Sequence, residues 1–310
     1  LYIPDRNDSL DLTLNRYVDY LPAMTFQSLR TQYHQRLAED IIRIRSSGDR
    51  TYPNFADGGS RSSRAIASGI TRQIGRSGRT DTVHGQTAGR RFERITCDFL
   101  VDSFAHLQHL RPAEWAYLTT NTAISNFDQY RHLAHIDELV QDDDTLASAL
   151  GRDYLITPDI VVGRCPVEDS TINAEEHLLD PDDHDVAGKT PLRASNVGAE
   201  TLILHASISC KWTIRSGRSQ NARTEALNLI RNRKGRTPHI VAVTAEPLPT
   251  RIASIALGTG DLDGVYHFAL PELVQAVTDA DTPDQREMLN MLIDGQRLRD
   301  ISDLPFDLVT

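Results

Sequence analysis

The segment LILHASISCK, residues 202–211, is rich in apolar residues and ends on a charged one. Charged side chains rarely lie inside buried strands, so this segment predicts a buried β-strand that ends at its lysine. YLITPDIVVGR (154–164) precedes it as another predicted strand, and HIVAVTA (239–245) and GVYHFAL (264–270) follow a predicted helix at 221–232. This order predicts an α/β fold with a mixed central β-sheet flanked by helices.

Helical patterns dominate the amino-terminal half of the chain. Helices are predicted at about 25–45, at 66–74 with isoleucines four positions apart, at 90–110 and at 127–150, and a short strand is predicted at 115–118. A polar loop is expected after the first helix, and a glycine-rich loop at 77–89. The helix at 90–110 has the strongest core-facing stripe, formed by Phe92, Ile95, Phe99, Leu107 and Leu110.

The composition is that of an ordinary globular protein. The 310 residues are 39% hydrophobic and 25% charged, with a mean hydropathy of -0.38. No Pro/Gly/Ser-rich linker divides them, so a single domain spanning residues 1–310 is predicted. The three cysteines form no CxxC or zinc-ligand pattern, which fits a reduced cytosol, and the sequence has no membrane-length apolar run and no signal peptide. We therefore expect a cytoplasmic protein.

Basic residues are concentrated in two segments, although the formal net charge is -10. Residues 207–236 contain eight of them and a single acid, and residues 61–94 contain eight arginines and two acids. The negative net charge excludes a uniform attraction to nucleic acid, so any polyanion site must be local to such segments. Residues 165–187 hold eight acids and no Lys or Arg, and we interpret them as a solvated surface excursion.

Two predicted strands end or pause at charged residues: Lys211 ends one of them, and Asp159 follows Pro158 inside the other. If these strand ends are neighbours, one carboxylate and one ammonium can hold a divalent cation and a phosphate together, as phosphodiester hydrolysis requires. The spacing alone is a weak signal, because Pro-Asp is also common in turns. Glu93 and Glu225 offer two more carboxylates, although each alone is more often a solvated helix residue.

A longer run of local sequence resembles the NgoMIV family of type II restriction endonucleases, which have the PD-(D/E)xK nuclease fold. The segments that carry the resemblance are ITPDIV, SISCKWTIRS, NARTEALNLIRNRKGR, PHIVAVTAEP, RIASIALGTGDLD and VYHFALPEL, together with LQHLRPAEW, GQTAGRRFE and RLRDISDLPFDL. The resemblance implies a restriction-endonuclease-like catalytic core at about 90–280, with the amino-terminal part contributing DNA contacts.

The same resemblance implies a Mg²⁺-dependent catalytic centre. Its catalytic residues would be Glu93, Asp159, Ser209, Lys211 and Glu225. Asp159 and the backbone carbonyl of Cys210 would ligate Mg²⁺, and Glu93 and Glu225 would complete the inner or outer coordination shell. Lys211 would orient the attacking water and contact the scissile phosphate. The implied reaction is in-line hydrolysis that leaves a 5′-phosphate.

The resemblance also implies which residues read the DNA sequence. These are Arg215 and Arg218 for the inner guanines of CCGG, and Asp57, Gln86 and Arg251 for the outer base pair, with Gln86 in the minor groove. A planar guanidinium matches guanine O6 and N7, which makes arginine a plausible major-groove reader. Taken without the resemblance, Asp57 and Gln86 would be interpreted as turn and loop residues.

One position departs from the family's Arg-Ser-Asp-Arg element, because Gly217 stands where the family has its aspartate. Glycine has no side chain that could accept a hydrogen bond from cytosine N4. Three explanations stay open: cytosine readout is relaxed, another acid or a water substitutes, or the DNA site differs. The three residues expected to read the outer base pair have the same residue types as in the family, which favours a GCCGGC-type site cut after the first G. Arg231, Arg233, Lys234 and Arg236 are expected to contact phosphates.

Cleavage of a palindromic site requires two-fold protein symmetry, so a homodimer is the minimum assembly. The resemblance implies a homotetramer that engages two DNA sites, and a cognate DNA methyltransferase in the same prokaryotic system. Two other interpretations stay open: a catalytically silent, sequence-selective DNA-binding protein on the same fold, and a structure-selective nuclease.

Overall fold

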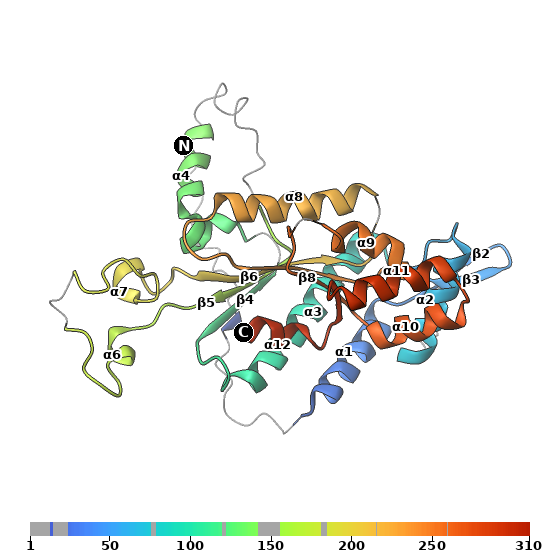
Figure 1. Cartoon of the computed structure of the whole chain (residues 1–310), viewed down its shortest axis with the longest axis horizontal. Helices are drawn as coiled ribbons and strands as arrows, with labels where there is room; N and C mark the ends of the chain where they lie inside the picture. Colours follow the sequence, from blue (N-terminus) through green and yellow to red (C-terminus); the bar gives the residue numbers. More distant parts are fainter. Residues whose placement is uncertain are drawn as a thin grey trace.

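The computed structural model describes residues 13–14, 24–75, 79–119, 122–141, 156–180, 185–214, 216–258 and 260–310. Within these residues, seven strands form one sheet in the order β1-β4-β5-β6-β7-β8-β9. They are β1 (Thr13–Leu14), β4 (Trp115–Thr119), β5 (Ile160–Arg164), β6 (Ile203–Lys211), β7 (His239–Thr244), β8 (Gly264–His267) and β9 (Leu298–Asp300). Helices lie on both sides of the sheet (Figure 1), which confirms the predicted α/β class.

The pairing direction changes at β6. Strands β4, β5 and β6 pair antiparallel, whereas β6, β7, β8 and β9 pair parallel, so the sheet is mixed as predicted. Ile160 at the start of β5 lies opposite Ile208, and Lys211 at the end of β6 lies opposite Thr244 at the end of β7. The start of β5 and the ends of β6 and β7 therefore meet at one end of the sheet.

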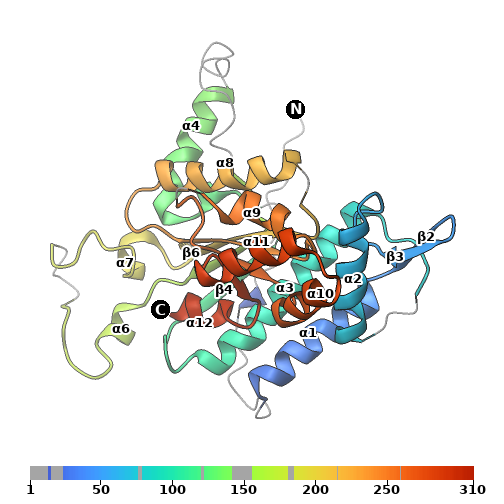
Figure 2. The same cartoon turned by 45° about the vertical axis from the view of Figure 1, so that its right-hand side comes forward.

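The helices form a layer on each side of this sheet. Figure 2 shows α8 (Ser216–Asn232) on one side, and α1 (Phe26–Asp40), α3 (Gly85–Leu107) and α12 (Leu304–Val309) on the other. The remaining α-helices are α2 (Arg61–Ile74), α4 (Arg131–Gln141), α6 (Asp169–Ile172), α7 (Ala194–Val197), α9 (Pro249–Ala256), α10 (Leu270–Asp279) and α11 (Pro283–Asp294). Because helices cover both faces, β5 and β7 are runs of buried Ile and Val rather than alternating patterns.

Helix α1 is shorter than the predicted helix at 25–45. It begins as expected, since Thr25 Oγ1 accepts a hydrogen bond from the Ser28 N–H at 3.2 Å. It ends at Asp40, and arginine side chains satisfy its last carbonyls. Arg79 donates to the carbonyl of Glu39 at 2.7 Å, and Arg91 donates to that of Asp40 at 2.6 Å.

A β-hairpin replaces the polar loop that was predicted after α1. Strands β2 (Ile44–Ser47) and β3 (Arg50–Pro53) pair antiparallel, and Gly48 adopts a φ of 59° in the turn between them. The hairpin projects from the body of the molecule (Figure 1), and most of its residues are exposed. Its sequence therefore lacks the apolar alternation that would have revealed it.

Helix α3 begins at Gly85, five residues before the predicted start. Residues 85–89 were assigned to a glycine-rich loop because glycine is a weak helix former, but they form the first turns of α3. Phe92, Ile95, Phe99 and Leu107 are buried, as the core-facing stripe predicted. Leu110 was wrongly included in that stripe: it follows the end of the helix and is 55% exposed.

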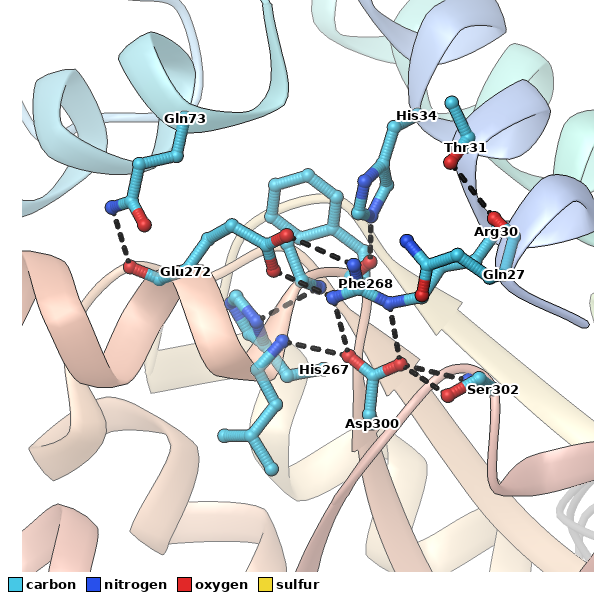
Figure 3. A network of polar contacts seen from close by, with 12 residues as sticks. Gln27, Arg30, Thr31, His34, Gln73, His267, Phe268, Glu272, Asp300 and Ser302 are labelled. Carbon is cyan, nitrogen blue, oxygen red and sulfur yellow. Dashed lines mark hydrogen bonds and ion pairs between the residues drawn. The ribbon is translucent and has the colours of Figure 1, made fainter.

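A buried ion network joins α1 to the last strand of the sheet (Figure 3). Arg30 donates to both carboxylate oxygens of Asp300, at 2.8 and 2.9 Å, and to both of Glu272, at 2.9 and 2.6 Å. Burial acts to raise the pKa of Asp300 and of Glu272, but Arg30 outweighs it and holds both pKa values below their usual range. The Leu270 N–H and Ser302 also donate to Asp300. The network fixes α1 against α10 and β9.

The other predicted elements are present, but two of the predicted strands are too long. The strand predicted at 154–164 begins only at Ile160, because Pro158 has no N–H to donate to a neighbouring strand. The strand predicted at 264–270 ends at His267, and α10 begins at Leu270. The strand at 115–118 is β4, and the helices at 66–74 and 221–232 lie within α2 and α8. Part of the predicted helix at 127–150 is α4, while residues 142–150 lie outside the described residues, as do 154 and 155 of the predicted strand at 154–164. The three cysteines are buried and form no disulfide. None of the described helices combines the length and apolar character that crossing a membrane requires.

The acidic excursion projects from the side of the molecule opposite the β2–β3 hairpin (Figure 1). Its described residues are mostly exposed, as predicted, and residues 181–184 lie outside the described part. Asp169 forms a bidentate ion pair with Arg193, at 2.9 and 2.7 Å, which anchors α6 to the segment that precedes α7.

Candidate active site

The start of β5 and the end of β6 bring Asp159 and Lys211 together. Lys211 Nζ donates to Asp159 Oδ2 at 2.9 Å, and the same oxygen accepts the backbone N–H of Cys210 at 2.7 Å. Burial acts to lower the pKa of Lys211, but Asp159 and Glu225 outweigh it and hold this pKa above its usual value. Lys211 is therefore a protonated, partly buried cation at the carboxyl end of β6.

Two further carboxylates approach this pair from helices on opposite sides of the sheet. Burial raises the pKa of Glu93 on α3, and the charge of Asp159 raises it further. Burial also raises the pKa of Glu225 on α8, although Lys211 acts to lower it. Three carboxylates thus share the surroundings of one lysine, and their mutual repulsion makes an additional cation favourable here.

A cavity of about 670 Å³ opens at this end of the sheet. Of the residues predicted from the sequence, its lining includes Glu93, Asp159, Cys210, Lys211, Glu225, Asp57, Gln86 and Arg251. Phe55 and Trp212 also line it, and their rings pack edge to face with centroids 5.6 Å apart. The structure therefore brings the catalytic and outer-base candidates into one cavity.

Two of the outer-base candidates contact each other across this cavity. Arg251, on α9, forms an ion pair with Asp57, which precedes α2. Asp57 Oδ1 also accepts the Gly59 N–H at 3.0 Å, so the turn role considered for Asp57 is present alongside the ion pair. Gln86 lies in the first turn of α3, seven positions before Glu93 on the same helix.

Some predicted site residues are not brought into this cavity. Ser209 does not line it, and its Oγ is buried without a hydrogen-bond partner in the described part of the chain. Arg215 lies outside the described residues, and Arg218 is described only as backbone of α8. Cys210 contacts Asp159 through its N–H, so a role for its carbonyl stays a prediction.

The basic segments are only partly directed at the cavity. Arg231, Arg233, Lys234 and Arg236 lie between the last turn of α8 and the start of β7, away from the ends of β6 and β7, and none lines the cavity. Arg223 forms an ion pair with Asp261 at 2.8 Å. In the other segment, Arg64, Arg79 and Arg91 donate to backbone carbonyls rather than pairing with surface acids. Arg90 does line the cavity.

Sequence reasoning missed two charged residues beside the cavity. Arg45, on the exposed strand β2, lines it directly. Glu246 follows β7, is 1% exposed, and lies with Oε1 3.8 Å from Arg251 Nη1. A charged residue directly after a buried strand was the signal that identified Lys211, and the segment HIVAVTAE carries the same signal for Glu246.

The donor set at this site is compatible with Mg²⁺. Among the described residues, no three His, Cys, Asp or Glu side chains are grouped as a ready-made metal site. Mg²⁺ does not require such a group, because it is usually held by one or two carboxylates together with water and substrate phosphates. Asp159 and Glu93 provide two hard oxygen donors, and a cation between them would relieve the repulsion that raises the pKa of Glu93.

The chain was compared with known families, sequences and structures. The family model described as NgoMIV restriction enzyme matches residues 33–310. The type II restriction enzyme NgoMIV of Neisseria gonorrhoeae is 45% identical over 287 residues, which cover 91% of this chain and 98% of that protein. Among solved structures, the type IIF restriction endonuclease Bse634I with cognate DNA matches 79% of this chain and 99% of its own, at 11% identity and a TM-score of 0.34.

Proposed function

Since this chain belongs to the NgoMIV restriction enzyme family, we propose that it cuts double-stranded DNA at a palindromic GCCGGC-type site. The enzyme is a type II restriction endonuclease. The cut falls after the first G and leaves 5′-phosphate ends. The observation that carries the proposal is the 2.9 Å contact between Lys211 and Asp159, in a cavity that Asp57, Gln86 and Arg251 also line.

Each catalytic side chain has a distinct role in this hydrolysis. Asp159 and the backbone carbonyl of Cys210 would hold Mg²⁺, and Glu93 and Glu225 would complete its inner or outer coordination shell. When bound, Mg²⁺ lowers the pKa of water and offsets phosphate charge. Lys211 stays protonated between Asp159 and Glu225, so it contacts the scissile phosphate and stabilises the negative charge that develops on it. Ser209 lies on the same strand, β6, two positions before Lys211.

Base recognition is divided between two groups of residues. Asp57, Gln86 and Arg251 read the outer base pair, and Arg215 and Arg218 read the inner guanines. Gly217 removes an acceptor for cytosine N4, and one lost base contact typically costs about 1–3 kcal/mol of discrimination. Recognition of the inner base pairs therefore depends on the two arginines, and it discriminates less strongly against sites in which the cytosine is replaced.

The palindromic site sets the assembly. Two active sites must face the two strands, so the chain acts as a homodimer at least, and as a homotetramer of two dimers that engages two sites. A methyltransferase that modifies the same sequence protects the DNA of the prokaryotic cell, in whose cytoplasm the enzyme works.

Digestion of a randomised DNA library, followed by sequencing of the ends, tests this function. With Mg²⁺ the expected products carry one recognition sequence and one cut position, and with Ca²⁺ the DNA is expected to be bound and left intact. Tight binding without any cleavage would favour the silent DNA-binding protein. Cleavage that requires branched or distorted DNA, with linear duplex left uncut, would favour the structure-selective nuclease.

A further inference from the structure

A buried carboxylate, that of Glu246, occupies the junction between the recognition and catalytic segments. It follows β7, and its carboxylate contacts two separate stretches of the chain. Oε2 accepts the backbone N–H of Ile214 at 2.9 Å, and Oε1 accepts that of Leu248 at 3.3 Å. Ile214 directly precedes the Arg215–Arg218 element, and Leu248 is the N-cap of the helix that carries Arg251.

A second set of contacts ties Glu246 to the end of β6. Thr244 Oγ1 donates to the carbonyl of Lys211 at 2.8 Å and accepts the backbone N–H of Glu246 at 3.1 Å. The backbone of the catalytic lysine is therefore two hydrogen bonds away from Glu246. A displacement of Glu246 would therefore affect the positions of both Lys211 and Ile214.

The carboxylate also faces Arg251, whose Nη1 lies 3.8 Å from Oε1, while Asp57 pairs with the same guanidinium from the other side. Arg251 is about one third exposed and Glu246 is buried, so the buried acid fixes the guanidinium while leaving it open to the cavity. An arginine side chain loses less conformational entropy on binding a base when its guanidinium is already held in the required orientation.

We propose that Glu246 is a positioning residue that holds Arg251 and Ile214 in register with Lys211, and thereby couples outer-base recognition to cleavage. This inference rests on the proposed function of Arg251 and Lys211. It predicts that discrimination at the outer base pair depends on a residue that does not itself reach the DNA.

The ionised form of Glu246 suits this role best. An ionised carboxylate accepts from both N–H groups and attracts Arg251, whereas a protonated one has weaker acceptors and no charge. Burial raises the pKa of Glu246 to about 7, and the charge of Asp57 adds to this rise. The N–H groups of Ile214 and Leu248 and the charge of Arg251 act in the opposite direction. The neighbouring ring of His267 stays neutral near pH 7, because burial lowers its pKa to about 4.

The test compares the wild-type enzyme with Glu246→Gln and with the matched control Glu287→Gln on the exposed face of α11. The ratio of kcat/KM for the full site to that for sites altered at the outer base pair is measured from pH 6 to pH 9. For the wild type this ratio is expected to rise as pH increases through about 7. For Glu246→Gln it is expected to be about tenfold lower at pH 8, a loss of the size typical of a weakened base contact, and to vary little with pH. KM is expected to rise more than kcat falls.

A second measurement needs neither DNA nor cleavage. Hydrogen exchange of the free enzyme should show the amide of Ile214 losing protection in Glu246→Gln and in the wild type below pH 7, after correction for intrinsic exchange. Equal outer-base discrimination and equal Ile214 protection in wild type and Glu246→Gln at every pH would overturn the proposal. If the wild type cuts no discrete site, the proposed function fails, and the exchange experiment alone decides whether Glu246 holds the segment.

Discussion

Lys211 and Asp159 are 52 positions apart in the sequence, and their side chains meet at 2.9 Å because β5 and β6 pair antiparallel. A residue just before one strand and a residue at the end of the other then lie side by side. Neither residue belongs to a compact motif, so the pair exists only once the two strands are in register. A shift of one residue in that register would turn Lys211 to the opposite face of the sheet.

Asp159→Ala is expected to abolish cleavage while DNA binding in Ca²⁺-free, Mg²⁺-free buffer persists. The carboxylate pairs with Lys211 and is the proposed metal ligand, and removing a negative charge is not expected to weaken the binding of DNA phosphates. Rates of plasmid cleavage and gel-shift affinities measure the two effects. Asp294→Ala, on the exposed face of α11, is the matched control and should cut normally. Sustained cleavage by Asp159→Ala would mean that the metal is held elsewhere.

Arg251→Ala is expected to relax specificity at the outer base pair by about 1–3 kcal/mol, with the cut position unchanged. The guanidinium lines the cavity and pairs with Asp57, so its loss would remove the proposed base contact together with this ion pair. Library digestion gives the specificity directly. Arg286→Ala, whose partner Asp281 is exposed, is the control. Uniform loss of cleavage at every sequence would instead mark Arg251 as a phosphate contact.

Arg45→Ala is expected to weaken binding to all DNA sequences alike. Arg45 is exposed on the projecting hairpin and also lines the cavity, where it can reach the phosphate backbone that flanks the site. The dependence of log affinity on log salt concentration should become shallower by about 1, the effect of losing one phosphate contact. Binding titrations at several salt concentrations, on cognate and unrelated duplexes, provide the measurement. An effect confined to the cognate duplex would contradict this interpretation.

Arg30→Met is expected to lower the free energy of unfolding by about 3–5 kcal/mol at pH 7, because Asp300 and Glu272 would remain buried without a cation. Arg36→Met on the same helix removes a half-exposed pair with Asp98 and should cost about 0–1 kcal/mol. Urea unfolding measures both. The pKa values of Asp300 and Glu272 are depressed in the folded state. The stabilisation that these two ionised carboxylates provide is therefore complete above about pH 4, the pKa of such groups in the unfolded chain. It is lost as the pH falls through their lower pKa values in the folded protein. The gap between wild type and Arg30→Met should shrink in acid.

Gly69→Ala is expected to destabilise the protein by about 1–3 kcal/mol, although alanine is normally the better helix former. A methyl group at this position of α2 would lie 2.7 Å from the Cβ of Ala276 on α10. Thermal unfolding measures the loss. The double variant Gly69→Ala/Ala276→Gly removes the clash and should recover most of it, which separates close packing from a local effect on the helix. Absence of rescue would contradict the packing argument.

The central strands could be predicted from the sequence, as could β4 and β8, whereas the β2–β3 hairpin and strand β9 could not. Continuous Ile and Val runs identify β5 and β7 because helices cover both of their faces. Strand β9 has only three residues, and its fixed position depends on Arg30, some 270 positions away. The end of α1 depends in the same way on Arg79 and Arg91, which no local pattern near residue 40 reveals.

The candidate site was predictable to a similar extent. Asp159 and Lys211 are charged residues at strand ends, which is a signal in the residues themselves. Glu93 and Glu225 resemble ordinary solvated helix residues, so the family resemblance was needed to single them out. Glu246 follows a buried strand, as Lys211 ends one, but the sequence does not show its partners, which include two backbone N–H groups.

The Arg30 network also has a consequence for biosynthesis. Arg30 is synthesised before Glu272 and Asp300. A nascent chain on the ribosome therefore carries α1 before the two acids that fix it are present. Tyr33 of α1 forms a hydrogen bond with Thr96 of α3, the helix that presents Glu93. The two acids that fix α1 beside the helix of the candidate active site therefore join the fold only after residues 272 and 300 have been synthesised.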